Sequence, residues 1–289
     1  MSQEQPAMGH KRSMEMKVLA EGLSFPEGPA FAPDGALWCV ELRGGNLVRF
    51  GPEGLQRIPT QGSPNGLAFD RKGRAWLCDA GQNAIRCYDP HTGGFETIVA
   101  RIDDQPLAKP NDLIFDAAGN LLFTCPDDSS IEPTGYVCCL KTAGGIVRIA
   151  EKLCFPNGLA LTPDGRDLVV AETFRRRLWR GAWEPRTWSW TGAHGWADVG
   201  GPAGPDGMAF GADGCLYVAV FGTGLVKIVA RTGRILDVLE VPGRQPTNVA
   251  FDPKGKLGLV VTEAERGLLV SFPQFGPGAP LYDGGANWL

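Results

Sequence analysis

The stretch "FPEGPAFAPDG", residues 25–35, decides the fold, because five variants of it follow along the chain. They are "SPNGLAFDRKG", "KPNDLIFDAAG", "FPNGLALTPDG", "GPDGMAFGADG" and "QPTNVAFDPKG". In every copy of this proline phrase, a Phe or Leu stands five positions after the proline and a Gly nine positions after it. The prolines are Pro26, Pro64, Pro110, Pro156, Pro205 and Pro246. Six copies without an internal slip indicate a repeat architecture.

Each proline phrase leads through a turn into a β-rich run such as "ALWCVE" or "DLVVAE", and two more strand-like runs follow in most copies. Four strands per unit at a spacing of 38 to 49 residues predict an all-β fold, a six-bladed β-propeller with four antiparallel strands per blade. The segment "MKVLAEGL", residues 16–23, precedes the first phrase as a fourth strand precedes the later ones. We therefore expect the N-terminal strand to close the ring as the outer strand of blade six. Residues 15–289 form one domain in this interpretation, behind a disordered tail at 1–14.

Composition narrows the class of protein. The net charge of −4 argues against a polyanionic partner, and no apolar run reaches the roughly 18 residues that a membrane-spanning helix needs. The start of the chain lacks an apolar leader, and the eight Cys include no CxxC pair, so we expect reduced thiols and a cytoplasmic protein, monomeric or homodimeric. The Trp- and Arg-rich segment 175–196 could bind single-stranded nucleic acid, but we favour two outer strands of blade four.

The residue after each proline carries the functional signal. In a propeller the first strand of every blade lines the central channel, so these residues face one mouth. All six offer oxygen atoms, which suit a hard cation such as Ca²⁺, whereas Zn²⁺ usually takes His or Cys. Asn and Asp also favour turns, but two unpaired carboxylates converging on one axis repel each other unless a cation lies between them. The ring consists of Glu27, Asn65, Asn111, Asn157, Asp206 and Thr247.

The phrases "FPEGPAF", "KPNDLIFD", "FPNGLAL" and "GPDGMAF" resemble the SMP-30/gluconolactonase/luciferin-regenerating-enzyme family of six-bladed propellers, over roughly residues 15 to 275. The resemblance implies one divalent cation in the channel, most commonly Ca²⁺, with Zn²⁺, Mn²⁺ and Fe²⁺ left open. Its implied ligands are Glu27, Asn157 and Asp206, with Asn111 as a further ligand or a substrate contact. In sugar lactonases of the family, a basic residue two positions before that Asn holds substrate, and Lys109 matches it.

The resemblance also implies hydrolysis of a lactone, a small-molecule substrate. A channel cation would polarise the carbonyl group, and Asp206 would assist the attacking water, with Asn111 as a second catalytic residue. Asn65, Lys109, Asn111 and Asp112 are the expected substrate contacts, and Asp112 also supports Asp206. We expect the loop at residues 126–135 to shape selectivity, together with four aromatic side chains, Phe25, Phe155, Phe174 and Phe221.

Other functions remain open from the sequence. The related diisopropylfluorophosphatases use a similar set of four ligands, so a phosphotriesterase-like hydrolase is one alternative. A propeller that serves as a non-enzymatic interaction module is another. A Ser-His-Asp triad is disfavoured, because none of the three His lies in a proline phrase.

Overall fold

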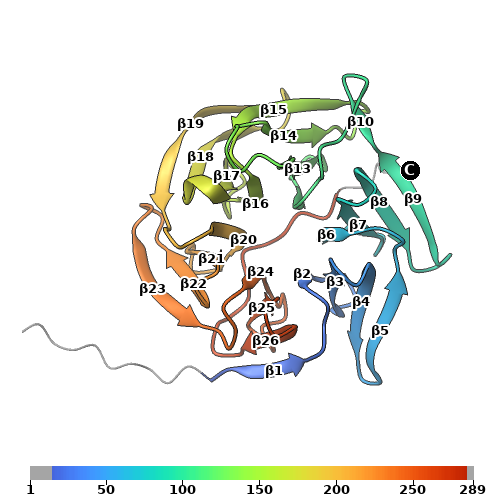
Figure 1. Cartoon of the computed structure of the whole chain (residues 1–289), viewed down its shortest axis with the longest axis vertical. Helices are drawn as coiled ribbons and strands as arrows, with labels where there is room; N and C mark the ends of the chain where they lie inside the picture. Colours follow the sequence, from blue (N-terminus) through green and yellow to red (C-terminus); the bar gives the residue numbers. More distant parts are fainter. Residues whose placement is uncertain (1–14, 285–289) are drawn as a thin grey trace, which may run out of the picture.

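The computed structural model describes residues 15–284, which form six four-stranded antiparallel sheets arranged as blades around a central axis (Figure 1). The predicted six-bladed β-propeller is therefore confirmed. The tail predicted at residues 1–14 lies outside the described residues.

Each blade begins with a proline phrase and runs outward in sequence order. Blade one consists of β2 (Pro26–Phe31), β3 (Leu37–Glu41), β4 (Asn46–Gly51) and β5 (Gly54–Pro59), and blade two of β6 (Pro64–Phe69), β7 (Ala75–Asp79), β8 (Ala84–Asp89) and β9 (Gly94–Val99). Blade three consists of β12 (Leu113–Phe115), β13 (Leu121–Cys125), β14 (Gly135–Leu140) and β15 (Ile146–Leu153), and blade four of β16 (Pro156–Leu161), β17 (Asp167–Glu172), β18 (Arg177–Glu184) and β19 (Ser189–Asp198). Blade five consists of β20 (Gly204–Phe210), β21 (Leu216–Phe221), β22 (Leu225–Val229) and β23 (Ile235–Glu240), and blade six of β24 (Pro246–Phe251), β25 (Leu259–Glu263), β26 (Leu268–Phe272) and β1 (Lys17–Ala20).

Two small elements lie outside this pattern. A two-stranded ribbon of β10 (Arg101–Ile102) and β11 (Gln105–Pro106) connects blades two and three, and a 3₁₀ turn, Thr173–Arg175, follows β17. The Trp- and Arg-rich segment forms β18 and β19, the two outer strands of blade four, as the sequence analysis favoured. Within residues 15–284 we find no helix with the length and apolar character needed to cross a membrane.

The repeated glycines fulfil a backbone requirement. The Gly that ends each proline phrase has a φ between 68° and 89° in all six blades, a region that L side chains rarely adopt. In blade one, the N–H of Gly35 donates to the carbonyl of Ala32 at 2.8 Å and closes the turn between the first two strands. This is the turn through which each proline phrase leads into the next strand.

A second glycine, two positions after the proline, lets the inner strands approach each other at the axis. A Cβ on Gly66 would lie 2.7 Å from Cα of Asp112, and one on Gly158 would lie 2.4 Å from the carbonyl oxygen of Asp206. Contacts this short exclude any side chain. Four blades have Gly at this position, and the other two carry Asp112 and Asn248.

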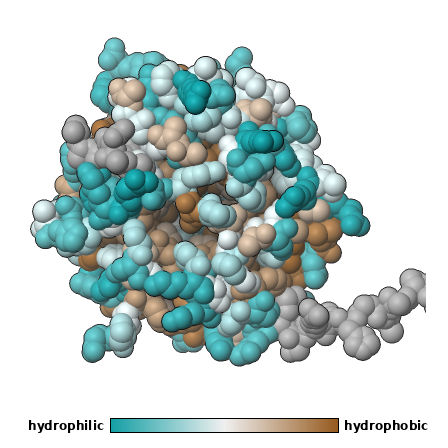
Figure 2. All heavy atoms as spheres, turned by 180° about the vertical axis from the view of Figure 1, so that it is seen from behind, coloured by the Kyte–Doolittle hydropathy of each residue, from teal (hydrophilic) through white to brown (hydrophobic). Residues whose placement is uncertain are grey.

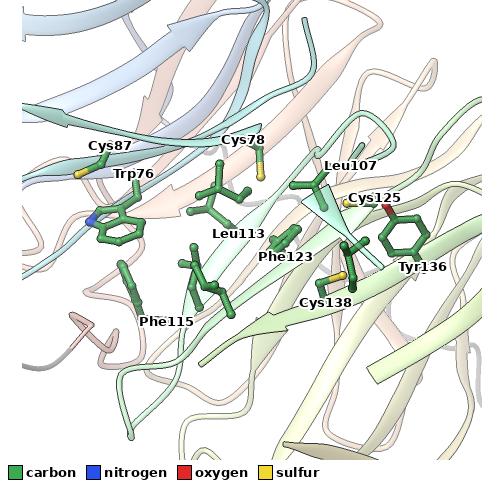
Figure 3. Packing of buried hydrophobic residues seen from close by; sticks show 14 residues of the cluster. Trp76, Cys78, Cys87, Leu107, Leu113, Phe115, Phe123, Cys125, Tyr136 and Cys138 are labelled. Carbon is green, nitrogen blue, oxygen red and sulfur yellow. The ribbon is translucent and has the colours of Figure 1, made fainter. Parts of the chain in front are cut away.

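The hydrophobic core is divided into six clusters, one between each pair of neighbouring blades. Figure 3 shows the cluster between blades two and three, where the rings of Trp76 and Phe115 meet edge to face at 5.5 Å. Cys78, Cys125 and Cys138 pack in the same cluster as small apolar residues. All eight Cys are free, and seven of them are buried.

The ring is closed by strands from the two ends of the chain. β1 pairs with β26 in an antiparallel register that sets Lys17 opposite Ser271. Near the axis, the hydroxyl of Thr247 in blade six donates to the carbonyl of Pro26 in blade one at 2.7 Å and lies 2.8 Å from the hydroxyl of Thr262. Thr247 is fully buried, and its bond to Pro26 joins the first and last blades.

A C-terminal strap, residues 277–284, crosses one end of the central channel (Figure 1). Gly278 bridges to Gly211 in blade five and Tyr282 to Phe115 in blade three, while Asp283 pairs with Arg71 in blade two at 3.0 Å. Between the strap and the blades lies a cavity of about 670 Å³, lined by apolar residues of all six inner strands and ending at Asp112 and Asn248. Figure 2 shows apolar residues around a hollow near the middle of the ring.

Replacing Thr247 with Val should weaken the junction between blades six and one. The change leaves the buried carbonyl of Pro26 without its donor, which typically costs about 1–3 kcal/mol. Urea unfolding should show this loss, whereas Thr92→Val, in an exposed turn, should leave the free energy of unfolding nearly unchanged. Equal midpoints for the two variants would contradict the role assigned to Thr247.

Candidate functional site

Three buried carboxylates converge near the axis from alternate blades. Glu27 lies in blade one, Asp112 in the phrase of blade three and Asp206 in blade five, and each is at most 8% exposed. Glu27 interacts electrostatically with both Asp206 and Asp112, and Asp206 interacts with Asp112. We call these three side chains the axial carboxylates.

Burial disfavours the charged form of all three axial carboxylates. It is the main cause that raises the pKa of Asp112 to about 7 and those of Glu27 and Asp206 well above their usual values. Repulsion between the axial carboxylates adds to the pKa shifts of Glu27 and Asp206. Ionising all three axial carboxylates therefore costs free energy unless a cation balances their charge.

No Lys or Arg among residues 15–284 forms an ion pair with an axial carboxylate, although other buried carboxylates in this chain do have such partners. Glu41 pairs with Arg57 at 2.9 Å, and Asp79 pairs with Arg86 at 2.9 Å. The difference sets the axial carboxylates apart, because a buried charge without a partner is costly.

Side-chain amides supply the donors that the axial carboxylates do have. Asn157 of blade four hydrogen-bonds to Asp206. Since a carboxylate only accepts, the amide nitrogen is the donor, and the carbonyl oxygen is the atom of Asn157 available to a cation. The site thus combines Glu27, Asn157 and Asp206, the three residues predicted to bind the ion, in one buried cluster. Their role as ligands stays a prediction.

The other predicted residues lie around this cluster in different ways. Asn65 and Asn111 are buried in the phrases of blades two and three, where Gly66 donates its N–H to the carbonyl of Asn111 at 2.6 Å. Lys109 is about half exposed, and its ammonium lies 2.5 Å from Asp128. Thr247 departs from the expected ring, because its hydroxyl serves the junction between blades six and one.

Asn248 is a member of the cluster that the sequence analysis missed. Its side chain hydrogen-bonds to the carboxylates of both Glu27 and Asp112. The sequence does mark this residue, because two positions after the proline four blades have Gly, whereas blades three and six have Asp112 in "PND" and Asn248 in "PTN". Of these two residues, Asp112 was among the expected substrate contacts and Asn248 was not.

Four aromatic rings lie in the loops next to the phrases, as two pairs. Phe25 stacks with Phe221 at 6.3 Å between ring centroids, and Phe155 meets Phe174 edge to face at 5.1 Å. Phe25 and Phe155 directly precede prolines with φ values of 58° and 59°, an unusual conformation for bulky residues. The residue after the second strand of blade one helps to hold this conformation, since the N–H of Leu42 donates to the carbonyl of Phe25.

The loop at residues 126–135 spans the phrases of blades three and four. Asp127 donates its N–H to the carbonyl of Ala108, and Ser129 accepts from the N–H of Phe155 at 2.8 Å. With the ion pair between Lys109 and Asp128, these contacts place the loop beside the segments that lead to Asn111 and Asn157. Its position is compatible with the selectivity role predicted for it.

The residue types at the axis fit a hard divalent cation. The cluster offers carboxylate and amide oxygens without His or Cys, which is the donor set of Ca²⁺. Among the described residues, no group of three His, Cys, Asp or Glu side chains could hold a metal ion. A cation at the axis therefore needs amide oxygens such as that of Asn157.

Comparison with known proteins shows the family of this chain. A family model described as "SMP-30/Gluconolactonase/LRE-like region" matches residues 25–265. A gluconolactonase of Zymomonas mobilis is 28% identical, and the alignment covers 84% of this chain and 78% of the relative. Pentonolactonase XacC of Haloferax volcanii is 30% identical, with 86% and 84% covered. The diisopropyl-fluorophosphatase of Loligo vulgaris is 27% identical, with 88% and 90% covered.

Solved structures share the architecture. The gluconolactonase XC5397 of Xanthomonas campestris superimposes with a TM-score of 0.79 at 26% identity, covering 90% of this chain and 89% of that one. Regucalcin of Agrobacterium tumefaciens, a calcium-binding protein, gives a TM-score of 0.78 at 24% identity, with 93% and 98% covered. At that identity the second likeness shows the fold alone.

Without divalent cations, the protein should lose stability as the pH rises from about 4 to above 7. The pKa values of the axial carboxylates are raised in the folded state, so that state binds more protons than the unfolded state across this interval. The free energy of unfolding therefore falls, by about 1.4 kcal/mol for each unit of pKa shift.

Urea unfolding at pH 5 and pH 8 in the presence of a chelator measures this effect. Asp112→Asn removes one titrating group and should reduce the difference between the two midpoints, and saturating Ca²⁺ should restore stability at pH 8. A chelated wild-type protein whose pH dependence equals that of Asp112→Asn would show that Asp112 carries no raised pKa.

Proposed function

The chain belongs to the SMP-30/gluconolactonase/LRE-like family, and from that premise we propose that it is a hydrolase that opens lactones with the help of a divalent cation, Ca²⁺ first among the candidates. One observation carries the proposal: three buried carboxylates meet at the axis without any cationic side chain, beside amide groups that suit a hard cation. The gluconolactonase and pentonolactonase relatives support lactones as the substrate class.

Glu27, Asn157 and Asp206 would hold the cation, with Asn111 as the fourth protein ligand. When bound, such a cation supplies Lewis-acid polarisation of the lactone carbonyl group. The amide nitrogen of Asn157 already serves Asp206, which fixes the direction in which its oxygen can bind. The axial carboxylates would then gain the positive partner that they lack.

The chemistry asked of the chain itself is proton transfer and orientation. Asp206 takes a proton from a water molecule while the water oxygen attacks the carbonyl carbon. The ring C–O bond then breaks, and the ring oxygen takes up a proton, so that lactone and water give a hydroxy acid. In the metal-free chain, desolvation raises the pKa of Asp206. Asp112 lies close enough to influence this charge.

Substrate contacts fall on residues at the channel and its mouth. Asn65, Asn111 and Asp112 are buried beside the cluster and offer polar atoms to the hydroxyl groups of a sugar lactone. Lys109 would contact the polar edge of the substrate, with its position held by Asp128 of the 126–135 loop.

A phosphotriesterase is the second candidate, favoured by the diisopropyl-fluorophosphatase among the relatives. The same ligands would polarise a phosphoryl oxygen instead of a carbonyl oxygen. An interaction module is a weaker candidate, because turn-forming residues alone do not account for three uncompensated carboxylates on one axis.

Purified protein loaded with Ca²⁺ should hydrolyse glucono- or pentonolactones, and a chelator should abolish the activity. Asp206→Asn should lower kcat/KM by about 10²-fold or more, because it removes the proton acceptor and a ligand charge. Acid release measured with a pH indicator follows the reaction. Asp237→Asn, on the exposed outer strand β23, is the matched control and should retain full activity.

The result separates the candidates. A protein that binds Ca²⁺ and cleaves organophosphates but no lactone would be a phosphotriesterase. Failure to bind any divalent cation would overturn both hydrolase proposals and leave the interaction module.

A further inference from the structure

Asn248 lies among the axial carboxylates, although it is not one of the predicted ligands. It stands in the phrase of blade six, at the position where four other blades have Gly. It is 8% exposed and reaches Glu27 in the neighbouring blade one and Asp112 in blade three, on the opposite side of the ring. A single amide thus connects two of the three axial carboxylates.

The hydrogen bonds fix the orientation of this amide. The N–H of Val249 donates to Oδ1 of Asn248 at 2.8 Å, so the oxygen is already occupied. Since a carboxylate only accepts hydrogen bonds, the amide nitrogen with its two hydrogens is the end of the side chain that faces Glu27 and Asp112. Rotating the amide by 180° would turn its oxygen towards two carboxylates, which the charges forbid.

The backbone around Asn248 is fixed as well. Its N–H donates to the hydroxyl of Thr262 at 3.1 Å, and that hydroxyl donates back to the carbonyl of Asn248 at 3.2 Å. Blade three repeats part of this arrangement, since Asp112 donates its N–H to the hydroxyl of Thr124 at 3.1 Å. The two non-glycine residues of the inner ring are therefore anchored alike.

The neighbouring blade leaves room for the side chain. A Cβ on Gly207 of blade five would lie 1.9 Å from Cγ of Asn248 and 2.0 Å from its Oδ1. The space that the amide fills therefore exists only because residue 207 has no side chain. Asn248 and Asp112 also line the apolar cavity beneath the C-terminal strap.

We propose that Asn248 is a positioning residue of the axial site, whose amide orients the predicted ligand Glu27 towards a divalent cation and holds Asp112 beside it. The inference rests on the proposed function for the identity of the ligand, but its argument uses only contacts within the chain. Asn suits this role because it donates to two carboxylates without adding charge. Asp would add a fourth negative group, and Leu would fill the volume without any donor.

Calcium binding to the chelator-treated full chain tests the proposal by isothermal titration calorimetry at pH 7.5. Asn248→Leu should weaken Ca²⁺ affinity by about tenfold or more, the usual effect of losing a partner that orients a ligand. Asn248→Gly restores the residue found in four other blades and should weaken binding similarly, which keeps the test valid if the Leu variant fails to fold.

Asn120→Leu is the matched control. Asn120 is also a buried amide that donates to a carboxylate, Asp116 at 2.8 Å, but it lies in the turn between β12 and β13, at the other end of β12 from Asp112. It should lose stability comparably, as measured by urea unfolding, and bind Ca²⁺ within about twofold of the wild type.

Three outcomes are distinguishable. Wild-type affinity in both Asn248 variants, or an equal loss in Asn120→Leu, would overturn the positioning role and leave the proposed function intact. A wild type that binds Ca²⁺ but hydrolyses no lactone would overturn the proposed reaction, while the affinity series still decides the role of Asn248. A wild type that binds no Ca²⁺ would overturn the role of Asn248 together with the metal site.

Discussion

The mutual repulsion of three buried carboxylates is the constraint on which the centre of this propeller depends. Glu27, Asp112 and Asp206 reach one place because inner strands meet closely at the axis, and the strands can do so because four blades have Gly two positions after the proline. In metal-free form this arrangement costs stability. Such a cost is typical of binding sites, where local unfavourable charge prepares a place for a ligand.

The same residue types serve scaffolding elsewhere in the chain, which shows that surroundings decide their role. In four blades, the second strand ends in a buried carboxylate that accepts a backbone N–H from the loop leading into the proline phrase of the same blade. Glu172 accepts from Cys154 at 2.8 Å, and Glu263 accepts from Gln245 at 2.9 Å. Glu41 and Asp79 do the same and also have Arg partners. Only the axial carboxylates combine burial, proximity to one another and the lack of a cationic partner in the described part of the chain.

Much of the fold was predictable, because each blade begins with a copy of the same sequence phrase. The prolines and turn glycines gave six blades in the right order, and the early segment at 16–23 gave the closing strand. The β10–β11 ribbon and the C-terminal strap were not predicted, since each occurs once and depends on tertiary contacts such as the bridge between Phe115 and Tyr282. At the site, the ligand set came from resemblance. Asn248 was missed and Thr247 was assigned to the ring, because adjacent residues of one inner strand turn to different sides and the sequence alone does not say which side faces the axis.

The closing strand also has a consequence for biosynthesis. β1 is synthesised before any of the six proline phrases, yet its partner β26 is made roughly 250 residues later, and closing so long a loop costs chain entropy. Blades one to five can assemble on the nascent chain, but the circle cannot be completed before synthesis has passed residue 272. Until then, the apolar faces of blades one and five that pack against blade six in the closed ring stay exposed, and at this stage chaperones or aggregation would compete with folding.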